Sequence, residues 1–148
     1  MVIRLSVRRW LDLDAFADGI TLPLLRIMTT VRILTTAGWS HPRHGIIDTG
    51  NPVTLIPRRV WSNGSIDLLT ATSRPVYGLG ATEASALRGR LGRVLLSLED
   101  DEGLSPTLPV TAYLLDDNRA PLLLGCEGVL TRAILRTNLA ALEASLEF

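Results

Sequence analysis

The sequence predicts a mainly β protein that folds as one domain. Glycine and proline recur 12 and 8 times among 148 residues, and the apolar runs between them are short. Those runs are rich in Val, Ile, Leu and Thr, residue types that favour strands. Hydrophobic residues make up 47% of the chain and charged residues 20%, which is typical of a globular protein rather than a disordered one. A chain of this length can bury a core without disulfides.

Several segments in the first half of the chain are expected to have regular structure. They are strands at residues 22–34, 45–48 and 53–56 and a short helical turn at residues 57–61. Residues 35–44 contain Gly and Pro and are expected to form a hairpin turn between the first two strands. We expect residues 1–20 to be an N-terminal arm or appendage and residues 21–148 to be the folded domain.

The second half of the chain continues the β pattern. Expected strands lie at residues 86–98, 108–115 and 121–125, with acidic turns at 100–103 and 116–119. Residues 86–98 alternate apolar and polar side chains, as a strand with one face in solvent does. A short C-terminal helix is expected to begin near Glu127. Residues 133–148 are ambiguous, because their leucines also fit the spacing of a helical stripe.

Composition excludes several classes of protein. Fifteen basic and fifteen acidic side chains cancel, so the chain has no electrostatic footprint for nucleic acid. The single cysteine, Cys126, excludes an internal disulfide framework and a cysteine-rich zinc site. No run approaches the roughly 20 apolar residues of a membrane span, and arginines interrupt the N-terminal segment where a secretory signal needs an apolar core. We expect a cytoplasmic protein without a membrane partner.

Asp48-Thr49-Gly50 is the most informative motif of the chain. A short apolar run leads into Asp48, and a second apolar run follows the turn. This pattern predicts a carboxylate at the end of a rigid strand, between the core and a cleft. No other Asp-Thr-Gly or Asp-Ser-Gly triplet occurs in the sequence. Chemistry that needs two such carboxylates would therefore take the second from another chain.

Two later segments follow this motif in order. The first is a glycine-containing bend formed by Gly78, Leu79, Gly80 and Ala81, and the second is the apolar run Leu-Leu-Leu-Gly at residues 122–125. Together the three segments resemble the retropepsin-like aspartic proteases, the single-domain relatives of pepsin that include retroviral and bacterial enzymes. The resemblance covers residues from about 22 to 148, most of the chain.

The resemblance implies a closed β-barrel with a flap hairpin that acts as a homodimeric aspartic endopeptidase. Each chain would supply one Asp48, and the two carboxylates would share one proton and hold one water. Two carboxylates about 3 Å apart cannot both ionise, so one stays protonated while the other accepts the proton of the water. No metal or cofactor would be required.

The resemblance also assigns roles around Asp48. Thr49 would link the two loops across the dimer axis, Gly50 would allow a tight turn, and Asn51 would lie beside the bound peptide. The bend at residues 78–81 would close over the peptide as the flap. Leu124 and Gly125 would pack behind the catalytic loop.

Three residues depart from the pattern of that family. Asn51 replaces a small residue, and Pro52 and Cys126 replace an acid and an arginine that pair in retroviral members. These departures favour an alternative, a non-catalytic module that keeps the fold for peptide binding or dimerisation. An unrelated ligand-binding β-barrel is a weaker rival.

The simplest structural reading treats the motif as a turn whose carboxylate caps its own backbone. His41 and His44 are spaced for metal ligation, but their position in a Pro-containing loop without companion ligands favours solvated side chains.

Overall fold

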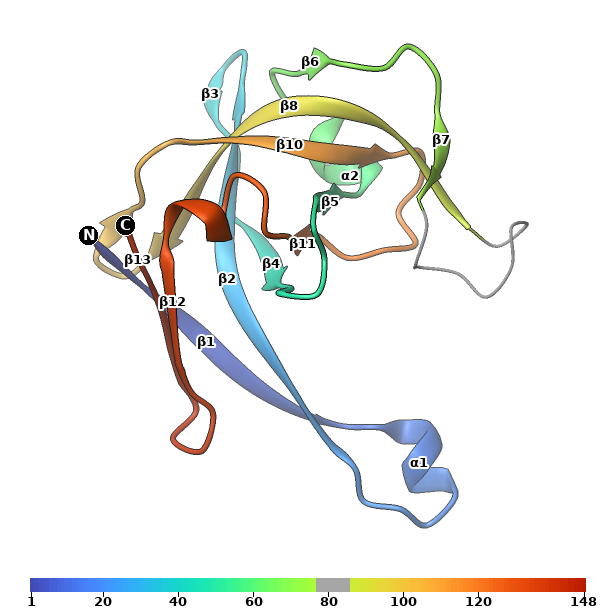
Figure 1. The fold of residues 1–148 in the computed structure, drawn as a ribbon, viewed down its shortest axis with the longest axis vertical. Coiled ribbons are helices and arrows are strands. Elements are labelled where there is room, and N and C mark those ends of the chain that lie inside the picture. Colours follow the sequence, from blue (N-terminus) through green and yellow to red (C-terminus); the bar gives the residue numbers. More distant parts are fainter. Residues whose placement is uncertain (77–85) are drawn as a thin grey trace.

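The computed structural model describes residues 1–76 and 86–148 and shows a closed β-barrel (Figure 1). Strands account for 54% of residues and helices for 9%, and six strands close the barrel. In order around the barrel they are β2 (Pro23–Thr35), β4 (Arg43–Ile47), β11 (Leu123–Leu124), β5 (Thr54–Ile56), β10 (Leu108–Leu115) and β8 (Leu87–Asp100). Pairing of β8 with β2 completes the circle. The predicted mainly β class and closed barrel are confirmed.

Three strands extend the sheet beyond β2. They are β1 (Val2–Leu11), β13 (Glu143–Glu147) and β12 (Ile134–Asn138), paired antiparallel in that order. This pairing places the two ends of the chain side by side (Figure 1). The terminal amine of Met1 donates a hydrogen bond to the Phe148 carbonyl at 2.9 Å.

Short strands and helices complete the described chain. The strands are β3 (Gly38–Trp39) on β2, and β6 (Asp67–Leu68), β7 (Arg74–Val76) and β9 (Gly103–Leu104) on β8. The helices are α1 (Leu13–Ala17), α2 (Arg58–Trp61) and the 3-10 turn η2 (Leu130–Arg132). The helical turn predicted at residues 57–61 is thus confirmed. No helix in the described ranges is long and apolar enough to cross a membrane.

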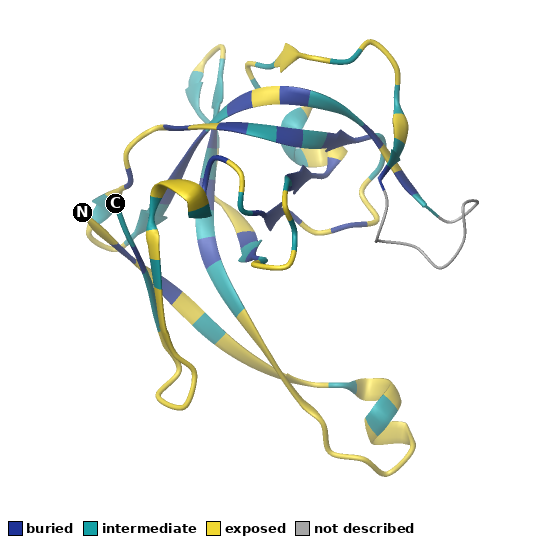
Figure 2. Cartoon of the chain, in the orientation of Figure 1, coloured by how far each residue is buried: buried dark blue, intermediate teal, exposed yellow. Residues whose placement is uncertain are grey.

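The strands of the barrel are rich in buried residues (Figure 2), and the buried apolar side chains form two clusters. Leu124 and Ile56 belong to the larger cluster, whereas their chain neighbours Leu123 and Leu55 belong to a second one. Successive side chains of a strand point to opposite faces, so these strands need apolar residues at every position. This requirement explains why residues 121–125 read as one uninterrupted apolar run.

The predicted C-terminal helix is present only as the single 3-10 turn η2, and residues 134–147 form the β12–β13 hairpin. Leu135 and Leu146 face each other across the hairpin, and Leu146 is fully buried. The tip residue Leu142 is exposed and has a left-handed backbone (φ 58°). The leucine spacing fitted either structure, and pairing of β13 with β1 favours the strand.

Residues 1–20, expected to be an arm, consist of two different parts. Ile3 and Leu5 on β1 are buried in the core. Beyond Ser6, β1 pairs with the start of β2, and the two strands leave the barrel together with α1 at their tip (Figures 1 and 2). We call residues 8–26 of this projecting hairpin the arm.

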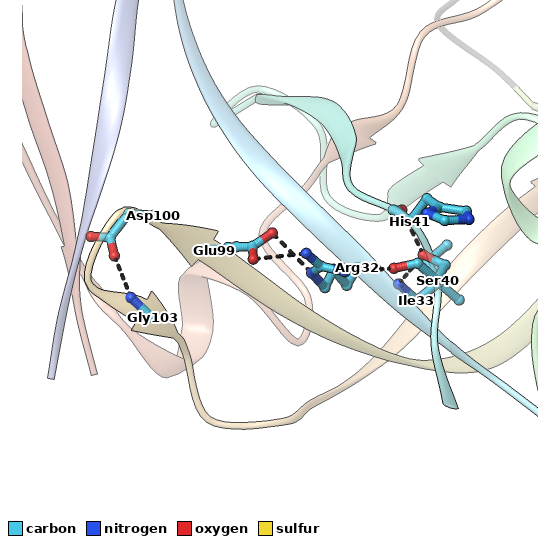
Figure 3. Close-up of polar contacts among 7 residues, drawn as sticks. All are labelled: Arg32, Ile33, Ser40, His41, Glu99, Asp100 and Gly103. Atoms are coloured by element: carbon cyan, nitrogen blue, oxygen red, sulfur yellow. Dashed lines mark hydrogen bonds and ion pairs between the residues drawn. The ribbon is translucent and has the colours of Figure 1, made fainter. Parts of the chain in front are cut away.

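An ion pair supports the closure of the barrel (Figure 3). Arg32 on β2 donates to both carboxylate oxygens of Glu99 on β8, at 2.9 and 2.8 Å. A third hydrogen bond joins Arg32 to the carbonyl of Ser40 at 3.0 Å. The bond to Glu99 raises the pKa of Arg32 above its ordinary value. This forked contact joins the first and last strands of the barrel.

Candidate functional site

Asp48 stands immediately after β4, at the end of a strand held on both sides. On one side β4 pairs with β2, and on the other it runs parallel to β11. The Asp48 N–H donates to the carbonyl of Leu124 at 2.9 Å, so the ladder with β11 continues through Asp48 itself. The Asp48 residue is half-buried, whereas Thr49 and Gly50 are exposed. The barrel wall therefore fixes the backbone of Asp48 and leaves its turn open to a partner.

The turn after Asp48 is closed by two hydrogen bonds. The Gly50 N–H donates to Asp48 Oδ1 at 3.0 Å, and the Asn51 N–H donates to the Asp48 carbonyl at 3.2 Å. Gly50 is not among the glycines with a left-handed backbone, and a Cβ there would lie 3.4 Å from Asp48 Oδ1. Within one chain, the backbone of this turn therefore gives no reason for a glycine, contrary to the role expected for Gly50.

Gly125 lies directly behind the turn, where no side chain fits. A Cβ on Gly125 would come within 2.7 Å of the Asn51 carbonyl oxygen and of the Val53 carbonyl carbon. Its N–H donates to the hydroxyl of Thr54, which is fully buried, at 3.1 Å. Leu124 and Gly125 thus support the Asp48 turn from behind by direct backbone contact.

Cys126 and Glu127 continue this contact past Gly125. The Cys126 N–H donates to the Asn51 carbonyl at 2.9 Å, and the Glu127 N–H donates to the Pro52 carbonyl at 3.0 Å. The Cys126 thiol lies 3.6 Å from the Thr49 carbonyl. Backbone hydrogen bonds therefore hold the loop at the positions where the family pattern has an ion pair.

Thr54 is a supporting residue that the sequence reading missed. Thr54 is the one polar residue in the otherwise apolar run Val53–Ile56. This exception was the signal in the sequence that could have identified it. Threonine is also common in strands for its shape alone, so the signal was easily read as strand propensity.

The predicted flap residues Gly78, Leu79, Gly80 and Ala81 lie outside the described residues. The strands on either side of them pair antiparallel, with Val76 opposite Leu87.

In the part of the chain that the structure describes, no group of three or more His, Cys, Asp or Glu side chains could hold a metal ion. His41 and His44 are both exposed.

No family model and no curated protein matches the sequence. The functional argument therefore depends on the residues and their geometry.

Proposed function

We propose that the chain is a homodimeric aspartic endopeptidase of the retropepsin type, in which Asp48 supplies half of a catalytic dyad. The observation that carries this proposal is the frame around Asp48. A strand end, the parallel strand β11 and the side-chain-free Gly125 together hold one carboxylate beside an exposed turn. An ordinary turn does not need its carboxylate fixed in this way. A catalytic carboxylate does, because it must be positioned correctly relative to the reacting carbonyl group.

The proposed reaction is hydrolysis of a peptide bond by a water held between two Asp48 side chains. The ionised carboxylate takes a proton from the water as it attacks, and the protonated one donates a hydrogen bond to the carbonyl oxygen. The two groups would share one proton, because two carboxylates this close repel each other when both are ionised. By the same resemblance, Gly78, Leu79, Gly80 and Ala81 would form the flap that excludes water from the bound peptide.

The exposed apolar side chains of the arm favour a second copy of this chain as the dimerisation partner. Eight large apolar residues there are exposed: Trp10, Leu11, Leu13, Phe16, Ile20, Leu22, Leu24 and Leu25. Large exposed apolar side chains gathered on one projecting hairpin favour an interface there. The arm begins beside the Asp48 turn, because β2 pairs with β4 up to Ile27 opposite Ile47. A second copy bound along the arm would therefore lie next to Asp48.

The decisive experiment compares the parent protein with Asp48→Asn on a peptide library between about pH 3 and pH 7, where such dyads are active. We expect the parent to cleave, a pepstatin-like inhibitor to block cleavage, and Asp48→Asn to lose at least about a thousandfold in rate. Asp67→Asn, which changes an exposed aspartate on β6, is the matched control and should cleave normally. Equal cleavage by the Asp48→Asn and parent proteins would refute the mechanism.

A non-catalytic module for peptide binding or dimerisation is the second candidate. The observation that favours it is the hydrogen bond from the Gly50 N–H to Asp48 Oδ1, because a carboxylate that only caps its own turn makes the same contact. Binding of library peptides by the parent protein without cleavage at any pH would favour this module over the enzyme.

A further inference from the structure

A basic groove lies along β4, the strand that leads into Asp48. Its volume is about 450 Å³, and its lining includes three arginines, Arg26, Arg43 and Arg59, together with His44. No aspartate or glutamate among the described residues lines it, although the whole chain has as many acidic as basic residues. The groove therefore concentrates positive charge on a protein whose net charge is zero.

Strand geometry links this groove to Asp48. Side chains alternate along β4, so His44 and Ile46, which both line the groove, share a face with the next alternate position, Asp48. On β2, Met28 pairs with Ile46. Continuing this antiparallel register past Ile27 and Ile47 brings Arg26 opposite Asp48. The groove thus has Arg26 at its end nearest the candidate catalytic carboxylate.

The arginines of the groove have no carboxylate partner among the described residues. The ion pairs found there join other arginines: Arg4 to Glu102, Arg32 to Glu99, Arg119 to Asp117 and Arg136 to Glu147. The guanidinium of Arg26 instead lies over the ring of Trp10, 5.3 Å from its centre. Arg59 donates to the carbonyl of Asn118 at 3.3 Å. These neutral contacts orient two of the guanidinium groups without compensating their charge.

A neighbouring hollow extends the same basic surface. It measures about 420 Å³, shares Arg43 and Arg59 with the groove, and adds His41. Among the residues that the structure describes, no carboxylate lines this hollow either. The two hollows share Arg43 and Arg59 and so form one basic strip.

We propose that this groove binds acidic side chains of an extended peptide, so that the substrates are proteins with glutamate or aspartate on one side of the cleaved bond. The proposal rests on the proposed endopeptidase function. Arginine forks pair with carboxylates through two parallel hydrogen bonds, which gives both attraction and orientation. Met28, Ile46 and Leu122 also line the groove and offer an apolar surface to the aliphatic part of a glutamate.

Nucleic acid fits this groove less well than an acidic peptide. Binding of single strands needs aromatic faces on which bases can stack. Among the described residues, Trp10 is the one aromatic side chain that lines the groove, and Arg26 already covers its ring; the neighbouring hollow adds a single further one, Trp39.

The test measures binding separately from cleavage. Asp48→Asn protein is titrated into a fluorescein-labelled glutamate-rich peptide and into the matched glutamine peptide, and fluorescence anisotropy reports the dissociation constants. We expect the glutamate peptide to bind at least about fivefold tighter, with an advantage that shrinks as salt rises. In the Asp48→Asn background, Arg26→Gln and Arg59→Gln should each weaken its binding about two- to fivefold. Arg132→Gln, at an equally exposed arginine on η2, is the control and should leave binding unchanged.

Three results of the binding measurements would overturn the proposal: equal binding of the two peptides, equal weakening by Arg132→Gln, or tighter binding of a single-stranded oligonucleotide. A cleavage assay of the parent protein distinguishes the failure of the groove proposal from the failure of the endopeptidase proposal. If the parent cleaves peptides without regard to acidic residues, the groove assignment fails and the endopeptidase stands. If the glutamate peptide binds through Arg26 and Arg59 but no peptide is cleaved, the groove stands and the endopeptidase fails.

Discussion

The hydroxyl of Thr54 accepts a hydrogen bond from the Gly125 N–H at 3.1 Å inside the barrel wall, directly behind the Asp48 turn. Thr54 is fully buried, so no solvent can replace this bond. We expect Thr54→Val to lower the free energy of unfolding by about 1–3 kcal/mol, because the Gly125 N–H loses its partner. Urea denaturation measures the change.

The control for this prediction is Thr54→Ser, which keeps the hydroxyl and removes one methyl group. Its expected cost is about 0.8 kcal/mol. If serine and valine destabilise the protein equally, the hydrogen bond is not what Thr54 contributes.

Gly125→Ala should distort the Asp48 turn from behind. The new methyl group would meet backbone atoms of Asn51 and Val53 at 2.7 Å, and backbone cannot yield as a flexible side chain can. We expect a loss of about 1–3 kcal/mol in unfolding free energy, typical of overpacking, together with reduced cleavage. Gly50→Ala is the comparison for stability, because its methyl would meet only Asp48 Oδ1 at 3.4 Å. A smaller loss for Gly125→Ala than for Gly50→Ala would contradict this view of the turn.

Sequence patterns predicted the barrel strands well, because burial on one or both faces of a strand produces an alternating or a continuous run of apolar residues. The strand expected at residues 108–115 has these same bounds in the structure. β1 was not predicted, because its outer half leaves the core and carries arginines where a buried strand has apolar residues. The C-terminal hairpin stayed ambiguous in the sequence because four leucines fit two periodicities, and only the contact with β1 distinguishes them.

Prediction of the candidate site was limited in the same way, since sequence patterns do not show contacts between distant segments. Asp48 could be found because its motif is contiguous in the sequence. The basic groove could not, because its residues come from β1, β2, α2 and the segments 42–46 and 121–122 and meet only in three dimensions. No local pattern distinguishes Arg26 from the arginines that form ion pairs elsewhere.

The arm should control dimer formation. Phe16 and Leu13 on α1 are 58% and 77% exposed, so charging them should not disturb the barrel of a single chain. We expect Leu13→Glu combined with Phe16→Glu to weaken dimerisation at least about tenfold, since burying one such side chain contributes about 1.5–3 kcal/mol. Cleavage should fall in proportion to the loss of dimer. Sedimentation velocity measures the dimer fraction.

A distant exposed leucine provides the control for the arm. Leu68 on β6 is 48% exposed, and Leu68→Glu should leave dimer and cleavage unchanged. An unaltered dimer after both substitutions in α1 would show that the arm is not the interface.

Asp100 should make part of the stability of the protein dependent on pH. Its carboxylate accepts hydrogen bonds from the N–H groups of Arg4, Glu102 and Gly103, at 2.8, 2.9 and 3.1 Å (Figure 3 draws the bond from Gly103). Burial acts to raise the pKa of Asp100, but these bonds and the charge of Arg4 outweigh it, so the pKa lies below the ordinary 3.8.

A carboxylate whose folded-state pKa is lowered stabilises the protein above its unfolded-state pKa, and this contribution disappears as the pH falls through the folded-state value. Asp100→Asn should therefore be less stable than the parent near pH 7, by about 1 kcal/mol or less after solvent screening, with a gap that closes as the pH falls through the folded-state pKa of Asp100. Urea denaturation at several pH values measures the gap. Asp101→Asn, which removes the exposed neighbouring carboxylate, is the control. A gap that stays constant or widens in acid would mean that the three N–H groups do not favour the ionised form of Asp100.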